Sequence, residues 1–382
     1  MKTVRLGDVA EIVSGATPKS GVADFWDGDI AWVTPADLSK LEGPYISATP
    51  RTLTEEGVRS CSTNVLPVGS VLLSSRAPIG HVAINTVPMA TNQGFKSLVP
   101  RPGLEAKFLY HWLNSKTEYL QSLGNGATFK ELSKRTATQI EIPHPPIEEQ
   151  RRIAAILDQA DALRTKRRQS LAHLDDLTQS IFHAMFGATA DTVPLGDLCR
   201  FYSGGTPSKK KPELWAGELP WFSAKDLKAN ELWDSQDHIA ASVPEVTSLR
   251  LLPAETIAVV VRGMILAHSV PISVIRVPAT INQDLKAVLP RDDIQVDFLA
   301  SALRARTQWI LARTATAAHG TKRLETAVLE SIPIPEVSRS AQAEFARRVS
   351  QIRAERSAVE RVLAAEDELF ASLQSRAFSG GL

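Results

Sequence analysis

The sequence is an internal duplication. The phrase LGDVAEIVSGATP begins at Leu6, and a close copy, LGDLCRFYSGGTP, begins at Leu195, 189 residues later in a chain of 382. This period exceeds the roughly 20 to 50 residues of a solenoid repeat and has the size of a domain. The chain is therefore expected to fold as two similar units with internal pseudo-twofold symmetry.

The match between the copies continues well past the opening phrase. FWDGDIAWVTPADL from Phe25 returns as LWAGELPWFSAKDL from Leu214, TNQGFKSLVPR from Thr91 as INQDLKAVLPR from Ile281, and FKEL from Phe129 as TKRL from Thr321. The offset between the copies drifts between 186 and 192 residues. Short insertions in surface loops explain such a drift, because loops tolerate changes in length.

The first part of each copy, residues 1–146 and 188–335, has the pattern of a mixed α+β domain. Short apolar segments such as SVLLSS and TIAVVV are punctuated by Gly and Pro, which is typical of strands and turns. A helix is expected at Phe108–Leu120. The SGATP and SGGTP segments are interpreted as turns, since neither follows a strong strand pattern nor leads into a helix.

The second part of each copy, residues 147–187 and 336–382, is expected to be a long helix. Each follows a proline cluster, IPHPP or IPIPE, and residues 147–186 contain neither Pro nor Gly. Forty residues in a helix span about 60 Å. Apolar residues recur at steps of three and four, as in a coiled coil: Ile153, Ile156, Ala160, Leu163, Leu174, Leu177 and Ile181, then Phe345, Val349, Ile352, Val359, Leu363, Phe370 and Leu373.

This seam predicts that the two helices pack on each other, because a lone rod would leave its apolar face exposed. The alternative, in which each helix packs on its own globular domain, stays open.

Composition excludes several classes of protein. No run of about 18 apolar residues is present, so no membrane span is indicated, and a cytoplasmic location is expected. Cys61 and Cys199 lie in different copies without a CxxC partner, so neither a disulfide framework nor a metal site is indicated. With 43 basic and 42 acidic residues, the net charge of +1 permits a nucleic-acid partner without requiring one.

The common catalytic motifs are missing from the sequence. It contains no GxxxxGK[ST], no HExxH, no GxSxG, and no tetrapeptide of the kind that amino-methyltransferases carry. The acidic pairs Glu148–Glu149 and Asp175–Asp176 fall on the first long helix, where they are expected to face solvent or favour the helix dipole. We therefore assign no catalytic, cofactor-binding or metal-binding residue to this chain.

Three features together carry a family resemblance. The stretch PPIEEQRRIAAILDQADAL from Pro145, the doubled LGD…SG.TP…W.G…W phrase and the ending LFASLQSRAFSGGL resemble the specificity subunit of type I restriction-modification systems. The resemblance covers essentially the whole chain.

The resemblance implies two target-recognition domains that each read one half of a bipartite, asymmetric target in double-stranded DNA. The two long helices are then expected to pack antiparallel as a spacer between the domains. Two modification (methyltransferase) subunits would dock on this scaffold and supply S-adenosylmethionine for adenine methylation. Restriction subunits would add translocation and cleavage with ATP and Mg. The chain itself would be non-catalytic and would need no cofactor.

Comparison of the copies suggests which residues form the frame and which read DNA. Positions shared by both copies should be framework or contacts to phosphate, because they carry no sequence information. Asn92–Gln93 and Asn282–Gln283 resemble adenine readers. Their repetition favours a role in turns or buried hydrogen bonds instead.

The candidate DNA contacts come from shared cations and from dissimilar loops. Arg76 with Arg262 and Lys130 with Lys322 are candidate phosphate clamps, although surface solubility or a local ion pair explains them nearly as well. The loops at 124–129 and 315–321 are candidate base readers. The full set of candidate DNA-binding residues is Arg76, Asn125, Thr128, Lys130, Lys209, Lys210, Lys211, Arg262, His319, Thr321, Lys322 and Arg323.

Two other functions remain open at this point. A free-standing DNA-binding regulator would bind a bipartite site without methyltransferase partners. A helical interaction scaffold would use its long helices and ignore DNA.

Overall fold

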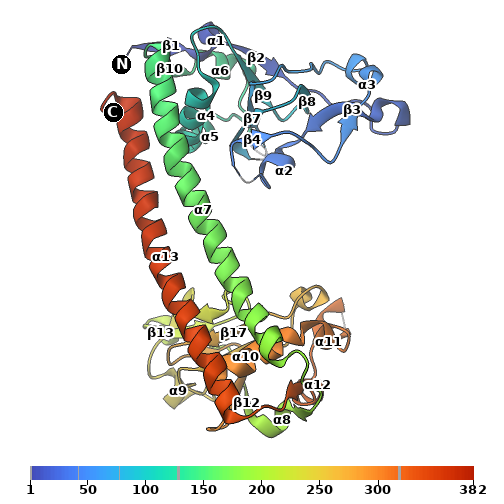
Figure 1. The fold of residues 1–382 in the computed structure, drawn as a ribbon, viewed down its shortest axis with the longest axis vertical. Helices are drawn as coiled ribbons and strands as arrows, with labels where there is room; N and C mark the ends of the chain where they lie inside the picture. Colours follow the sequence, from blue (N-terminus) through green and yellow to red (C-terminus); the bar gives the residue numbers. More distant parts are fainter. Residues whose placement is uncertain (1, 42, 77, 127–129, 317–319) are drawn as a thin grey trace. The chain divides into compact units, whose positions relative to one another are not determined.

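The computed structural model describes residues 2–41, 43–76, 78–126, 130–316 and 320–382. The chain divides into two compact units, each of which we describe by itself (Figure 1). Unit 1 contains residues 1–168 and 361–382, and unit 2 contains residues 169–360. Each unit therefore combines one globular part with half of each long helix.

The described part of unit 1 contains mixed sheets and short helices. A five-stranded sheet has the order β2-β9-β6-β7-β4, a three-stranded sheet the order β5-β3-β8, and β1 pairs with β10. The strands are β1 (Thr3–Arg5), β2 (Ala10–Ser14), β3 (Trp26–Val33), β4 (Tyr45–Ile46), β5 (Thr52–Leu53), β6 (Val71–Ser75), β7 (Ile79–Asn85), β8 (Met89–Thr91), β9 (Lys96–Pro100) and β10 (Glu141–Pro143). The helices are α1 (Leu6–Val9), η1 (Ala23–Phe25), α2 (Pro35–Leu38), α3 (Glu55–Arg59), α4 (Ala106–Ser115), α5 (Thr117–Ser122) and α6 (Lys134–Gln139).

The described part of unit 2 repeats this topology. Its sheets have the orders β12-β19-β16-β17-β14 and β15-β13-β18, β11 pairs with β22, and β20 pairs with β21. The strands are β11 (Thr192–Pro194), β12 (Cys199–Ser203), β13 (Leu219–Phe222), β14 (Glu231–Leu232), β15 (Asp237–Ile239), β16 (Thr256–Val260), β17 (Ile272–Ile275), β18 (Thr280–Ile281), β19 (Leu285–Pro290), β20 (Ala315–Thr316), β21 (Lys322–Arg323) and β22 (Pro333–Pro335). The helices are α8 (Leu195–Leu198), η2 (Pro212–Trp215), α9 (Val243–Val246), η3 (Met264–Ala267), α10 (Val296–Ala305), α11 (Thr307–Leu311) and α12 (Thr326–Glu330).

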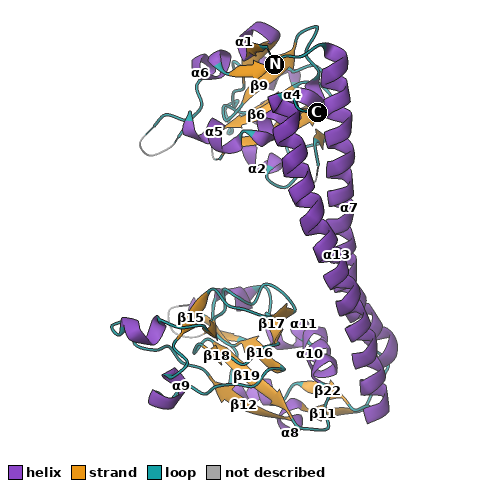
Figure 2. Cartoon of the chain, turned by 90° about the vertical axis from the view of Figure 1, so that its left-hand side faces the viewer, coloured by secondary structure: helices purple, strands orange, loops and turns teal. Residues whose placement is uncertain are grey.

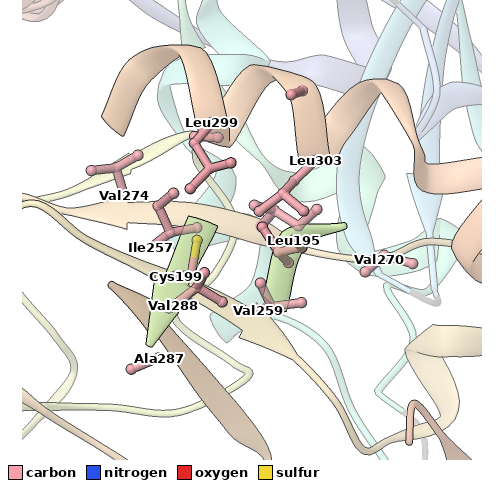
Figure 3. Close-up of a cluster of buried hydrophobic side chains, with 14 of the residues drawn as sticks. Leu195, Cys199, Ile257, Val259, Val270, Val274, Ala287, Val288, Leu299 and Leu303 are labelled. Carbon is pink, nitrogen blue, oxygen red and sulfur yellow. The ribbon is translucent and has the colours of Figure 1, made fainter. Parts of the chain in front are cut away.

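The central strands form where the sequence runs apolar without alternation. Every residue of β6 and β16 is buried, as expected for strands covered on both faces. The predicted strands SVLLSS and TIAVVV are therefore confirmed. Helix α4 packs on β7 and helix α10 on β17. In unit 2, α10 lies beside the large sheet (Figure 2), and its Leu299 and Leu303 join Ile257, Val259 and Val288 in one core (Figure 3).

The helix predicted at Phe108–Leu120 is two helices. α4 ends before Lys116, whose backbone (φ −116°, ψ 21°) leaves the helical range, and α5 begins at Thr117. The Thr117 hydroxyl donates a hydrogen bond to the Asn114 carbonyl, 3.0 Å away, and so stabilises the break. The apolar pattern continues across the break, so the sequence did not predict it.

The two long helices are α7 (Ile147–Phe186) and α13 (Arg339–Ser379). α7 begins directly after the proline pair, as expected. α13 begins three residues later than predicted, because the Ser338 hydroxyl caps it by accepting a hydrogen bond from the Ala341 backbone N–H at 3.3 Å. Across the described residues, no helix combines the length and the apolar character needed to cross a membrane.

The expected continuous apolar seam is wrong in part. Leu163 and Leu177 are exposed, and most other predicted seam residues are only half-buried. The fully buried apolar residues of both helices lie near their ends and join the domain cores: Ile153, Ala154, Leu157, Phe182, Phe186, Phe345, Val349 and Ala377.

Ion pairs join the two helices between those buried ends. In unit 1 the Arg164 Nε lies 2.6 Å from the Asp367 Oδ1, and in unit 2 an Arg356 guanidinium nitrogen lies 2.7 Å from the Asp175 Oδ1. Each helix therefore packs both on its partner helix, as favoured from the sequence, and on globular cores, as the alternative held.

Candidate nucleic-acid interface

The repeated SG.TP segments hold two backbones in close contact. A Cβ atom on Gly15 would lie 2.2 Å from the carbonyl oxygens of Thr91 and Asn92, and one on Gly204 would lie 2.1 Å from that of Ile281. Only glycine allows this approach. Both segments follow a strand, β2 or β12, which the sequence pattern did not indicate. After the strand they run without regular secondary structure and without a turn, so the predicted turns are wrong.

The repeated tryptophans connect the SG.TP segments to the small sheet by hydrogen bonds. The indole N–H of Trp32 and that of Trp221 each donate to the carbonyl of the residue after the motif glycine, at 3.1 and 2.9 Å. Trp26 meets Trp32 edge to face, and Trp215 meets Trp221 in the same way, with ring centroids 5.1 Å apart in both pairs. The shared tryptophans are therefore framework.

The repeated Asn-Gln pairs also belong to the frame. The Oδ1 atoms of Asn92 and Asn282 accept hydrogen bonds from the backbone N–H two residues later, at 2.8 and 3.0 Å. The hydroxyls of Thr17 and Thr206, one in each SG.TP segment, donate hydrogen bonds to the side-chain oxygens of Gln93 and Gln283 respectively. The preferred interpretation of these amides as turn-forming groups is confirmed.

In unit 1 the structure brings Arg76 together with the loop that holds Asn125 and Lys130. Asn125 and Glu131 exchange two backbone hydrogen bonds, of 3.1 and 2.9 Å, and both Asn125 and Lys130 are exposed. A guanidinium nitrogen of Arg76 lies 3.9 Å from the Glu131 carboxylate, which also accepts a 3.1 Å hydrogen bond from the buried Lys96. We call Arg76, Asn125, Lys130 and Glu131 the Arg76 cluster.

In unit 2 the equivalent residues gather without that acid. Arg262 forms an antiparallel bridge with Arg323, and the Lys322 ammonium donates to the Thr316 hydroxyl at 2.9 Å. Thr321 is half-buried, whereas Arg262 and Arg323 are exposed. Arg323 pairs with Glu325 at 3.3 Å. We call Arg262, Thr321, Lys322 and Arg323 the Arg262 cluster.

The two clusters occupy the same place in the frame. The Leu132 backbone N–H donates to the Ser75 carbonyl, and that of Leu324 to the Val261 carbonyl, both at 2.9 Å. Leu132 and Leu324 close the repeated words FKEL and TKRL. Glu131 of unit 1 thus stands where unit 2 has an arginine.

The remaining candidates lie elsewhere. Lys209, Lys210 and Lys211 are exposed on the loop that leads into η2. The indole N–H of Trp215, at the end of η2, donates a hydrogen bond to the Ser208 carbonyl of this loop at 3.3 Å. Thr128 and His319 lie outside the described residues.

Sequence reasoning missed two buried glutamines. Gln150 on α7 accepts a hydrogen bond from the Glu105 backbone N–H at 2.9 Å and donates to two carbonyls, and Gln342 on α13 accepts one from the Gln295 N–H at 3.1 Å. Each glutamine thereby fastens a long helix to the start of the helix that covers the sheet. Their 192-residue spacing, the same as that of FKEL and TKRL, was a usable signal.

A charged network in unit 2 was also missed. Arg276 is buried and pairs with Glu231, Glu255 and Asp297, and Arg353 of α13 reaches Glu231 at 2.7 Å. Burial by itself would raise the pKa of the Glu231 carboxyl. Hydrogen bonds from Arg353 and Arg276 outweigh that effect and hold the pKa of Glu231 below its ordinary value. These contacts anchor α13 to the globular part of unit 2.

The neighbouring Arg304 is held by backbone carbonyls. Its guanidinium donates to the carbonyls of Ile272 and Asn230, at 3.2 and 2.8 Å. Burial lowers the pKa of Arg304 to about 10.

Unit 1 fastens α7 with a smaller charged group. The Asp158 carboxylate lies 2.8 Å from the His111 Nε2 and 2.7 Å from the Lys107 ammonium. Burial by itself would raise the pKa of the Asp158 carboxyl. The hydrogen bonds to His111 and Lys107 outweigh that effect and lower the pKa of Asp158 below its ordinary value of 3.8. In both units these charged side chains have structural partners, which leaves the Arg76 cluster and the Arg262 cluster as the better candidates for a ligand.

The chain is similar in sequence to known proteins. The chain is 33% identical over 258 residues to the type I restriction enzyme MjaIX specificity subunit of Methanocaldococcus jannaschii. The match covers 62% of this chain and 60% of that protein. It is 31% identical over 248 residues to the EcoR124I/EcoR124II specificity subunit of Escherichia coli, covering 61% of this chain and 60% of that protein. The matched region thus spans three-fifths of each relative.

Two solved structures share the fold at low sequence identity. The S subunit of a type I restriction-modification system from M. genitalium aligns over 99% of this chain and 96% of its own, with a TM-score of 0.56 and 17% identity. A chain from a structural study of complex assembly and conformational transition in the type I system aligns over 100% of this chain and 98% of its own, with a TM-score of 0.59 and 18% identity.

The family match extends over both repeats. The sequence matches the family described as the type I restriction modification DNA specificity domain over residues 1–173 and again over residues 189–366. With the doubled frame and the two long helices in place, the chain belongs to the specificity subunits of type I restriction-modification systems.

Proposed function

We propose that the chain recognises a bipartite, asymmetric sequence in double-stranded DNA, one half-site per unit, and carries no catalytic activity itself. The observation that supports this most directly is the pairing of an identical frame with different side chains at the same place. Glu131 in unit 1 is replaced by Arg323 in unit 2, while the SG.TP segments, tryptophans and amides around them are repeated. A shared frame places each unit on the duplex, and the unshared side chains distinguish its bases.

The candidate contacts have distinct roles in this proposal. Arg76, Arg262, Lys130 and Lys322, which both units carry, contact phosphate and set the register. Asn125 and Thr321, which differ between the units, are the residues that we expect to face base edges. Lys209–Lys211 add phosphate contacts in unit 2, where unit 1 has Ser20, Gly21 and Val22 at the same offset.

The long helices scaffold the catalytic partners. Two modification subunits dock on them and supply S-adenosylmethionine for adenine methylation, and restriction subunits, where present, bring ATP and Mg. Exposed apolar side chains on these helices support docking of a protein, since such residues otherwise favour burial: Leu163, Leu177, Val362 and Leu369.

The test is to map methyladenine across the genome of cells that express the modification partner, with and without this chain. Loss of one bipartite motif on deletion is expected, and the motif identifies both half-sites at once. An unchanged methylome with an active partner would contradict the proposal.

Two further measurements identify the function in that case. Selective DNA binding without co-purification of the modification subunit would indicate a free-standing regulator. Co-purification without DNA binding would indicate a helical scaffold.

A further inference from the structure

One connection in unit 2 has no counterpart of its length in unit 1. Strands β6 and β7 are joined by residues 76–78, whereas β16 and β17 are joined by residues 261–271, which include the short helix η3. Gly263 starts this helix with φ of 142°, a backbone conformation that favours glycine. Its N–H donates to the Lys322 carbonyl at 3.1 Å, so the connection is fixed against β21.

The η3 turn buries one apolar side chain and exposes two. Leu266 is 2% exposed and joins the core of unit 2, which fixes the turn in place. Met264 is 63% exposed and Ile265 is 45% exposed. A rigid turn that presents two large apolar side chains to solvent loses favourable burial unless a ligand covers them.

The cations around these side chains indicate which ligand fits. Arg262 directly precedes the turn, and Lys322 and Arg323 lie on the strand that the turn packs against. Among the described residues, the ion pair that these cations make is the one between Arg323 and Glu325. Its side chains are 48% and 49% exposed, so Glu325 neutralises the charge of Arg323 only weakly. A polyanion with apolar groups between its charges matches such a surface.

DNA offers that combination in its major groove. Phosphates line the groove and attract the cations, and the C5-methyl group of thymine is the one apolar group on the base edges there. We infer that Met264 and Ile265 are specificity-determining residues of unit 2 that contact thymine methyl groups in its half-site. This inference rests on the proposed function and adds a contact of a different chemistry to it.

The test compares full-length variants, each expressed with the modification partner, by their methylation motifs. Met264→Gln nearly keeps the side-chain size, Ile265→Thr shortens the side chain by one carbon, and both reduce apolar character. The matched controls are Leu251→Gln and Val246→Thr, because Leu251 (50%) and Val246 (66%) are similarly exposed in unit 2 but lie outside the connection. The expected result is relaxed preference for thymine at one or two positions of a single half-site, with the other half-site and both controls unchanged.

A second measurement tests the methyl contact itself. Replacing each thymine of that half-site by deoxyuridine removes only a methyl group, and at the contacted position it should weaken binding of the wild-type complex about fourfold, as the loss of one buried methyl group predicts. The same replacement should not weaken binding of the Met264→Gln, Ile265→Thr double variant. Variants with normal circular dichroism that lose all methylation are assayed in this way too.

The outcomes separate this inference from the proposed function. A wild-type motif that both variants leave intact overturns the inference while the function stands. Insensitivity of the wild-type complex to every deoxyuridine replacement also overturns it. Variants that lose the modification partner but keep their base preference would assign the turn to a protein contact instead. A wild-type chain that directs no motif contradicts the function itself.

Discussion

The Arg76 cluster and the Arg262 cluster are built on the same frame and differ in charge. Both sit where a central strand of the large sheet meets a loop whose closing leucine N–H donates back to that strand at 2.9 Å. In unit 1, Glu131 partly neutralises Arg76 and Lys96. In unit 2 an arginine replaces that glutamate, and the η3 turn adds two exposed apolar side chains.

This difference separates residues that place a unit from residues that distinguish its ligand. Glycines, tryptophans and amides recur because the backbone crossing they stabilise must be the same in both units. Within the clusters the arginine and the lysine also recur, whereas Glu131 and Arg323 hold the same position with opposite charge. Four comparisons between the units test this division, beginning with the largest expected effect.

The frame should contribute equally to both units. Trp32→Ala and Trp221→Ala each remove a buried indole and its hydrogen bond, so each should lower the free energy of unfolding by about 3 to 5 kcal/mol. Urea-induced unfolding followed by circular dichroism measures both. The control Trp233→Ala, at a side chain that is 60% exposed, should change it by less than about 0.5 kcal/mol. Unequal losses in the two units would break the frame equivalence.

The anchors of the long helices should differ between the units. Strands β4 and β14 hold the same place, yet Tyr45 begins one and Glu231 the other. Glu231→Gln should lower the free energy of unfolding by about 2 kcal/mol, because it removes one of the two carboxylates, Glu231 and Asp297, that the buried Arg276 and the half-buried Arg353 share. Tyr45→Phe, the matched change, should cost about 1 kcal/mol or less. Equal losses would show that the network of unit 2 is not an anchor.

The contribution of Asp158, which anchors α7 in unit 1, to the free energy of unfolding should depend on pH. Because the pKa of Asp158 is lowered in the folded chain, its charge stabilises unit 1 above the ordinary pKa of 3.8, and this stability is lost as the pH falls through the folded value. Asp158→Asn should lower the free energy of unfolding by about 1.5 kcal/mol at pH 7. The gap to wild type should shrink below pH 3.8, and a gap that stays constant would contradict this assignment.

The charge difference should appear in the salt dependence of DNA binding. Arg323→Ala removes one positive charge from the proposed DNA interface, so the slope of log K against log salt should become less negative by about 1. Glu131→Ala releases Arg76 and Lys96 and should make that slope more negative. Arg59→Ala, at an exposed pair with Glu55, is the control and should leave it unchanged. A shift of the same sign for Arg323→Ala and Glu131→Ala would break the comparison.

The duplicated frame was predictable because internal comparison needs no structure. The repeated phrase around Leu6 and Leu195 predicted two alike α+β units, and the proline clusters predicted the start of α7. The turn role of Asn92 and Asn282 followed from their repetition, and their hydrogen bonds confirm it.

Other features depend on contacts that periodicity does not encode. The seam failed at Leu163 and Leu177 because helix-to-helix ion pairs and globular cores, rather than one apolar stripe, cover the two helices. The break at Lys116 depends on a local backbone change and a hydrogen bond from Thr117. The network of Arg276, Glu231 and Arg353 joins segments far apart in the sequence. No pattern in the sequence marked Met264 or Ile265 as exposed, and only the turn that follows Gly263 places them outside the core.

The central claim is that each unit reads its own half-site, and a cycle that crosses residue changes with half-site changes tests it most directly. Binding of the wild-type complex and of the variants Asn125→Ala and Thr321→Ala is measured on duplexes with either half-site scrambled. The account predicts that each variant loses affinity on the duplex that keeps its own half-site and loses none where that half-site is scrambled. Equal losses on both duplexes for both variants would contradict it.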